Sequence, residues 1–164
     1  MTKSPLHIRR AGALDCRALA ALLNEIIAIG GTTAKVELVT GDQLSTWMER
    51  EHAVWHLAED DTGKLLGFQY IQPHKDIPHD STDIATFTRV GQTGLGIGSA
   101  LFAATRKAAL EMGYVTIDAV IRADNEGGLA YYQSRGFETI KLLKDEKLSN
   151  GQVVDRVWKR CSLR

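Results

Sequence analysis

Hydrophobic residues recur along the chain with two different periods, and each period predicts a different kind of element. A spacing of three and four residues over 19–27 predicts an amphipathic helix that begins after Asp15 and ends at Gly30. The same spacing predicts a shorter helix within 40–51. A short strand over 6–10 is predicted before both helices.

From residue 53 the pattern changes to runs that are typical of β-strands, separated by turn residues. Helical and strand patterns then alternate to the end of the chain, which predicts a mixed α+β sheet rather than a repeated βαβ unit. The whole chain, residues 1–164, is therefore expected to form one domain. The predicted elements of this part are strands over 54–58, 65–71, 83–90 and 114–121, helices over 99–112 and 125–135, and a hairpin around 149–151.

Composition and charge exclude several classes of protein. Hydrophobic residues make up 44% of the 164 residues, which argues against disorder, and 20 Lys and Arg balance 20 Asp and Glu. This balance gives no overall attraction to nucleic acid or to an anionic membrane, so neither partner is expected. The longest apolar stretch, 18–29, contains Asn24 and Glu25 and is too short to span a bilayer. The first residues lack the pattern of a secretory signal, so we expect a cytoplasmic location.

The cysteines and histidines do not form a pattern typical of a metal or redox site. Cys16 and Cys161 are far apart in the sequence, and free cysteines are usually buried. The loop over 72–80 carries His74, His79 and Asp80, but further ligands at matching spacing are missing from the sequence around it. We therefore expect no metal.

A glycine-rich turn between a predicted strand and a predicted helix carries the strongest chemical signal. Its four glycines are residues 91, 94, 96 and 98. Glycine lets a ligand approach the backbone closely, and the free amides at a helix N-terminus attract anions. The turn therefore favours a ligand that contains a pyrophosphate, although a tight turn without any ligand is an alternative.

Two familiar phosphate motifs fit the turn poorly. A P-loop needs a lysine after the last glycine, and the sequence contains none between Lys75 and Lys107. A dinucleotide-binding GxGxxG motif that begins at Gly96 has Leu101 in place of its third glycine. Asp118 does lie about 20 residues further on, as a ribose-binding acid would. A dinucleotide-dependent oxidoreductase thus stays an alternative.

Two segments in this order resemble the GNAT superfamily of N-acetyltransferases. The first, over 94–101, reads GLGIGSAL, and the second, over 125–137, reads NEGGLAYYQSRGF. A third segment, over 24–34, resembles the branch that acetylates phosphinothricin and amino acids. The resemblance implies a mixed, mostly antiparallel central sheet flanked by helices.

The resemblance also implies how acetyl-coenzyme A would bind, in a V-shaped opening between two central strands. The strand edge at 86–88, with Thr88, would pair with the pantetheine amides, and Asn125 would contact the cofactor. Arg89, Arg122 and Arg135 are candidates for the 3′-phosphate. The implied pyrophosphate cradle consists of Thr93, Gly94, Leu95, Gly96, Ile97, Gly98 and Ser99, with Thr93 where the family has Gln or Arg.

Acetyl transfer needs a neutral amine and a proton for the departing thiolate. By the motif match, Tyr132 is the candidate acid, because a phenol with a pKa of about 10 can protonate a basic thiolate. Asp83, in a strand, and Asp118, in an otherwise apolar strand, are both candidate bases, and a water molecule is a third possibility.

The resemblance implies an enzyme that transfers acetyl from acetyl-coenzyme A to a primary amine by direct attack in a ternary complex. A small-molecule acceptor such as an amino acid is expected, because the neutral chain gives no hint of a charged macromolecular partner. Relatives are often dimers, so a homodimer is possible. The alternative function is a non-catalytic module that senses coenzyme A or a nucleotide.

Overall fold

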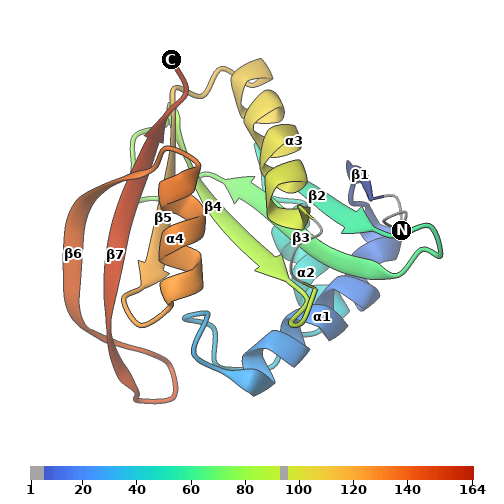
Figure 1. The fold of residues 1–164 in the computed structure, drawn as a ribbon, viewed down its shortest axis with the longest axis horizontal. Helices are drawn as coiled ribbons and strands as arrows, with labels where there is room; N and C mark the ends of the chain where they lie inside the picture. The colour runs from blue at the N-terminus through green and yellow to red at the C-terminus, as the bar shows by residue number, and fades with distance from the viewer. Residues whose placement is uncertain (1–5, 93–95) are drawn as a thin grey trace.

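The order of helices and strands follows the sequence pattern closely. The computed structural model describes residues 6–92 and 96–164 (Figure 1). A short 3-10 turn, Ala13–Asp15, precedes the first helix. The strands are β1 (His7–Arg10), β2 (Val54–Glu59), β3 (Leu65–Gln72), β4 (Ser81–Thr88), β5 (Thr116–Arg122), β6 (Glu138–Lys147) and β7 (Val153–Ser162); the helices are α1 (Cys16–Ile29), α2 (Gly41–Met48), α3 (Ile97–Glu111) and α4 (Glu126–Ser134).

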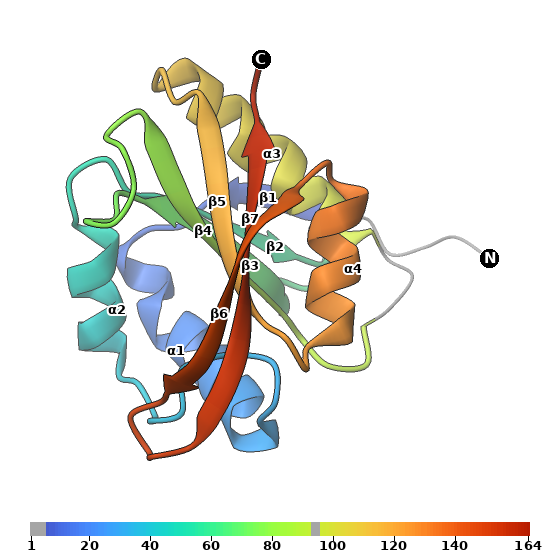
Figure 2. The ribbon, with the colours of Figure 1, turned by 90° about the vertical axis from the view of Figure 1, so that its left-hand side faces the viewer.

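One seven-stranded sheet organises the chain, in the order β1-β2-β3-β4-β5-β7-β6. Every neighbouring pair is antiparallel except β4 and β5, which run parallel. Helices α1 and α2 lie on one face of the sheet, and α3 and α4 lie on the other (Figure 2). The expected mixed, mostly antiparallel sheet flanked by helices is thus confirmed.

Each face of the sheet has its own hydrophobic core. Leu19, Leu22 and Leu23 of α1 pack with aromatic residues of β2 and β3, among which the Trp55 and Tyr70 rings stack at 4.2 Å. Across the sheet, residues of α3 pack with β5 and α4. Because successive residues of a strand point to opposite faces, each strand between the two layers contributes to both cores.

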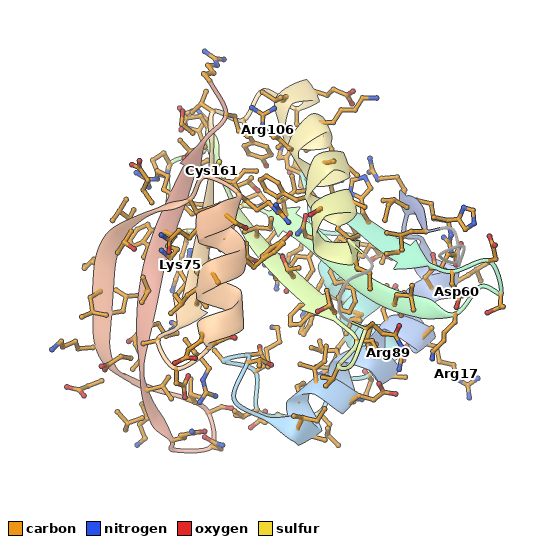
Figure 3. All side chains as sticks on the ribbon, viewed as in Figure 1. Arg17, Asp60, Lys75, Arg89, Arg106 and Cys161 are labelled. Atoms are coloured by element: carbon orange, nitrogen blue, oxygen red, sulfur yellow. The ribbon has the colours of Figure 1, made fainter. Side chains whose placement is uncertain are left out.

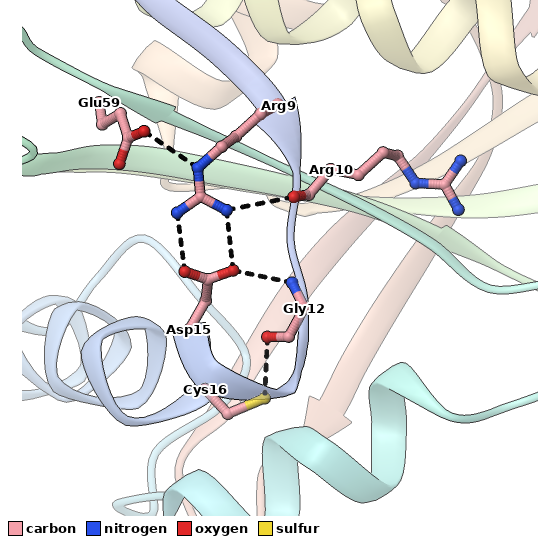
Figure 4. Close-up of polar contacts among 6 residues, drawn as sticks. All are labelled: Arg9, Arg10, Gly12, Asp15, Cys16 and Glu59. Carbon is pink, nitrogen blue, oxygen red and sulfur yellow. Dashed lines mark hydrogen bonds and ion pairs between the residues drawn. The ribbon is translucent and has the colours of Figure 1, made fainter.

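An arginine fixes the start of α1 against the edge of the sheet (Figure 4). Arg9 of β1 forms two hydrogen bonds with the Asp15 carboxylate, of 2.8 and 3.0 Å, and one of 2.9 Å with Glu59. Asp15 also accepts from the Gly12 amide at 2.8 Å. The sequence predicts that the helix begins after Asp15. The Asp15 carboxylate does not cap the helix but binds Arg9 and the Gly12 amide, which precede it in the chain.

Among the boundaries that differ from the sequence prediction, two border the site. Helix α3 begins at Ile97 rather than at residue 99, because Gly96 adopts a left-handed conformation with φ of 71° and serves as the N-cap. Strand β4 spans Ser81–Thr88 rather than 83–90, because its register on β3 runs from Asp83 to Thr88 and its pairing with β5 begins at Ser81. Both shifts change which backbone groups border the site.

Candidate active site

The parallel strands β4 and β5 diverge after a short paired segment. Only three register pairs join them: Ser81 with Thr116, Thr82 with Ile117, and Asp83 with Asp118. Beyond this point β5 continues its pairing with β7, whereas the β5-facing edge of β4 has no strand partner among the described residues (Figure 1). Unpaired backbone amides and carbonyls require other partners, and an extended ligand with amide groups can supply them.

The N-terminus of α3 lies near the end of β4 and offers backbone amides to an anion. The first amides of a helix have no partner in a preceding turn, and they carry the positive end of the helix dipole. Gly96 and Ser99 are exposed, and no side chain of the described residues caps this helix. The expected cradle residues Gly96, Ile97, Gly98 and Ser99 therefore share one helix start, whereas Thr93, Gly94 and Leu95 lie outside the described residues.

Gly98 is required by packing as well as by its place in the turn. A Cβ atom at this position would lie 2.6 Å from Cε1 of Tyr131. The absence of a side chain lets the Tyr131 hydroxyl donate a hydrogen bond of 2.7 Å to the Gly98 carbonyl. This bond joins the start of α3 to α4.

Asn125 caps α4 and also holds a distant loop. Its Oδ1 atom accepts from the Gly128 amide at 3.0 Å, as an N-cap does. Its Nδ2 atom donates to the Thr32 carbonyl at 3.1 Å. Asn125 therefore ties the segment between α1 and α2 to the beginning of α4, a contact that sequence spacing does not reveal.

Tyr132 is buried on the face of the sheet that α3 and α4 cover. Its Oη atom lies 2.7 Å from Oγ1 of Thr86, in the diverging part of β4. Burial raises the pKa of Tyr132 well above its usual value of about 10. The phenol thus keeps its proton until a strong base is formed beside it.

Asp83 and Asp118 occupy neighbouring positions but differ in their partners. Asp118 is buried, and both of its carboxylate oxygens accept hydrogen bonds of 2.8–3.0 Å from Trp158 and Arg160. Burial raises the pKa of Asp83 to about 7, and the charge of Asp118 adds to this rise. Asp83 can therefore exchange a proton near neutral pH, whereas Asp118 is held as an ion pair.

The two candidate proton-transfer groups lie on opposite faces of the sheet. The side chain of Asp83 shares one face of β4 with those of Ala85 and Phe87, which pack in the core beneath α1. The side chain of Thr86 points to the opposite face of the sheet, where it contacts Tyr132 of α4. A reacting group held between the diverging strands would thus meet a carboxylate from one face and a phenol from the other.

A pocket of about 400 Å³ lies on the same face as Asp83. The segment between α1 and α2, helix α2 and the hairpin of β6 and β7 supply its lining, including Lys35, Trp47 and Arg156. Trp47 of α2 is half-buried, and the centroid of its ring lies 4.3 Å from Lys35 Nζ. Sequence analysis missed this pocket because its two walls come from distant parts of the chain, residues 34–47 and 146–156.

The three arginines expected near the 3′-phosphate have protein partners. Arg89 forms an ion pair of 2.6 Å with Glu25 at the end of β4 (Figure 3). Arg122 is buried and pairs with Asp124 at 2.9 Å. Arg135 donates to Ser99 Oγ and lies over the Tyr131 ring, 5.1 Å from its centroid. Of the three, Arg135 is therefore beside the helix start that an anion would approach.

Both cysteines are buried and free, as expected. Burial raises the pKa of the Cys16 and Cys161 thiols, which disfavours the reactive thiolate. Cys161 packs in the core beneath α3 (Figure 3). Neither thiol has the surroundings of an activated nucleophile.

Comparisons with known proteins define the class of this fold. The structure resembles an N-acetyltransferase from Staphylococcus aureus Mu50 with a TM-score of 0.88 and 23% identity, covering 98% of this chain and 100% of that one. It resembles a ribosomal-protein-alanine N-acetyltransferase from Brucella melitensis with a TM-score of 0.86 and 24% identity, covering 95% and 99%. A phosphinothricin acetyltransferase from Sinorhizobium meliloti, solved in complex with acetyl-coenzyme A, gives a TM-score of 0.86 at 19% identity, covering 96% and 88%. The fold is that of the N-acetyltransferases.

A family model assigns the chain more directly. The model of the acetyltransferase (GNAT) family matches residues 21–137. The chain belongs to this family and is an acyltransferase that depends on acetyl-coenzyme A. No match was found among curated proteins. No helix among the described residues is long and apolar enough to cross a membrane.

Proposed function

We propose that the protein transfers the acetyl group of acetyl-coenzyme A to the primary amine of a small molecule that also carries a carboxylate, such as an amino acid. Transfer proceeds by direct attack in a ternary complex. One observation carries this proposal: a carboxylate with a pKa of about 7 and a buried phenol flank the diverging strands β4 and β5 from opposite faces. A thioester and an amine can therefore meet between a base and an acid.

The residues beside the diverging strands fit acetyl-coenzyme A. The free edge of β4, which ends at the exposed Thr88, suits the two amides of the pantetheine arm. The amides of Ile97, Gly98 and Ser99 suit its pyrophosphate, and Arg135 adds a positive charge beside them. Acetyl-coenzyme A supplies the acetyl group as a reactive thioester.

Asp83 takes a proton from the acceptor ammonium, directly or through water, and leaves the amine free to attack. Tyr132 gives its proton to the sulfur as the carbon–sulfur bond breaks. Asp118 pairs with Arg160 and acts on the reaction through Asp83, whose pKa it helps to raise. In this scheme Asp118 is a positioning residue rather than the base.

The charges around the pocket favour an acceptor that carries an anionic group. Lys35 and Arg156 both line the pocket, and both oppose the rise in the pKa of Asp83, so their charges lie close to that carboxylate. Arg156 uses one terminal nitrogen on Glu146 at 3.0 Å, and its Nε atom is buried without a partner among the described residues. A carboxylate of the acceptor can satisfy this guanidinium while its amine faces Asp83.

The substitution Arg156→Gln tests whether the acceptor carries a carboxylate that binds this guanidinium. We expect KM for a carboxylate-bearing acceptor to rise about 10- to 100-fold, because a charge-assisted hydrogen bond is lost. The corresponding amine without a carboxylate should react equally slowly with both enzymes. Lys144→Gln, at an exposed position on β6, serves as the control for the loss of one positive charge. An equal effect of Arg156→Gln on both acceptors would contradict the assignment.

A change at Ser99 tests the proposed pyrophosphate site. We expect Ser99→Asp to weaken acetyl-coenzyme A binding at least 10-fold, because it adds a negative charge beside the amides at the start of α3. The fold should tolerate this change, since acidic residues in a first helical turn are stabilising. Titration calorimetry with acetyl-coenzyme A, run beside NAD and ATP, gives the affinities. Ser99→Ala is the matched control, which keeps the amide and should bind within about threefold of the parent.

A further inference from the structure

A chain of hydrogen bonds runs beneath α3 and ends at Tyr132. The Tyr131 hydroxyl donates to the Gly98 carbonyl at 2.7 Å. The Gln69 side-chain nitrogen lies 3.1 Å from Tyr131 Oη and 2.8 Å from Thr86 Oγ1. Thr86 Oγ1 in turn lies 2.7 Å from Tyr132 Oη. Gln69 is completely buried, so protein groups alone determine its orientation.

The first hydrogen bonds of this series determine which group donates in each of those that follow. A carbonyl can only accept, so the single Tyr131 proton points to Gly98, and Tyr131 must accept from Gln69. The Gln69 atom beside Tyr131 is therefore the NH₂ group, and its second proton points to Thr86. Thr86 keeps its own proton, and the Tyr132 hydroxyl, 2.7 Å away, is placed to accept it.

This arrangement leaves one acceptor of Gln69 unused. Its Oε1 atom is buried and has no partner in the described part of the chain. The neighbouring position on β2 is His56, whose Nδ1 atom is also buried and unpaired there. Leaving a buried acceptor unpaired costs free energy, so the donor function of the amide is retained at a cost in stability.

We infer that Gln69 and Thr86 are positioning residues that make Thr86 donate to Tyr132, which directs the Tyr132 proton toward the sulfur of the cofactor. The inference rests on the proposed role of Tyr132 as the acid. When the amine nitrogen bonds to the acetyl carbon and the carbon–sulfur bond breaks, the Tyr132 proton moves to the sulfur and the nitrogen releases its remaining extra proton to water. The hydroxyl of Thr86 then donates to the phenolate that remains, and solvent later returns the proton.

Thr86→Val tests this inference because it removes the hydroxyl and keeps the shape of the side chain. We expect kcat to fall about 10- to 100-fold, with KM for acetyl-coenzyme A within about threefold, because a hydrogen bond to a developing charge is lost. Thr86→Ser restores the hydroxyl and should recover most of kcat. A thermal melt of each variant separates a loss of rate from a loss of folded protein.

Gln69→Glu reverses the direction of the hydrogen bond between residue 69 and Thr86 with little change in the shape of the side chain. At a pH where the introduced carboxyl is ionised it can only accept, so the Thr86 proton turns toward it and away from Tyr132, and kcat should fall as far as in Thr86→Val. If Gln69→Glu or Thr86→Val keeps the kcat of the parent, the inference is overturned.

A double variant separates this inference from the proposed function. In the Tyr132→Phe background, Thr86→Val should change kcat by less than about twofold, since the acid on which it acts is gone. Additive losses would mean that Thr86 acts by another route, which would overturn the inference alone. Full activity of Tyr132→Phe itself would instead remove Tyr132 from the chemistry and overturn the proposed function as well.

Discussion

Tyr132→Phe should lower kcat about 10²- to 10⁴-fold, the range measured for the loss of a general acid. Its hydroxyl is buried beside Thr86 in the diverging part of β4, and its raised pKa keeps it protonated at neutral pH. The affinity for acetyl-coenzyme A should stay within about threefold, because the cradle and the strand edge are unchanged. Steady-state kinetics and titration calorimetry measure the two quantities.

Tyr114→Phe is the matched control for this variant. Tyr114 is also buried, but it precedes β5, and its hydroxyl lies 3.4 Å from the His52 carbonyl. We expect its kcat to stay within about twofold of the parent. Equal losses in Tyr114→Phe and Tyr132→Phe would mean that general damage to the fold, rather than a missing acid, slows the reaction.

Asp83→Asn should lower kcat about 100-fold or more at pH 8 and should remove an inflection from the pH profile. In the parent protein a base must be charged, so the rate should rise as the pH passes through about 7, the pKa to which burial and Asp118 raise this carboxyl. The variant should show only the titration of the acceptor amine. An unchanged inflection near pH 7 would assign that group to another residue or to water.

The same substitution should stabilise the protein at high pH. A carboxyl whose folded-state pKa is raised binds more protons folded than unfolded between pH 4 and 7, so its contribution to stability is lost as the pH rises through that range. Asp83→Asn should therefore melt several degrees higher at pH 8, at about 2–4 °C for each kcal/mol. At pH 4 the two proteins should melt nearly together. A slow but more stable variant cannot owe its lost activity to unfolding.

The sequence predicts the order of elements because apolar spacing and glycine positions are local signals. Leu19 to Ile27 follow the period of a helix, and the sheet forms where the period changes. The start of α3 is harder to predict, because the sequence does not distinguish the left-handed Gly96 from a glycine in a loop. The motif segments predict the cradle and Tyr132 from relatives rather than from spacing.

The electrostatics of the site could not be read from the sequence. Asp83 and Asp118 become neighbours only because β4 pairs with β5 in parallel. Asp118 forms an ion pair with Arg160, which comes from β7, two strands later along the chain. The choice between the two candidate bases therefore depends on sheet register, a long-range property that local patterns do not encode.

The hydrogen bonds of Gln69 could not be predicted from the sequence either. A glutamine in an apolar strand gives no signal of what it will donate to, and its two partners come from β4 and α4. The pocket beside Lys35 and Arg156 likewise needs two segments that meet only in the folded chain. Sequence analysis predicts site residues from a family motif, whereas the hydrogen-bond partners of Tyr131 and Tyr132 emerge only in the folded chain.

The release of free coenzyme A thiol from acetyl-coenzyme A, measured across a panel of amino acids and their decarboxylated amines, tests the central claim most directly. The account predicts thiol release that depends on a primary amine, matches N-acetyl product one to one, and is fastest with a carboxylate-bearing acceptor. Saturable binding of acetyl-coenzyme A without thiol release on any amine would contradict it and would favour a module that senses coenzyme A.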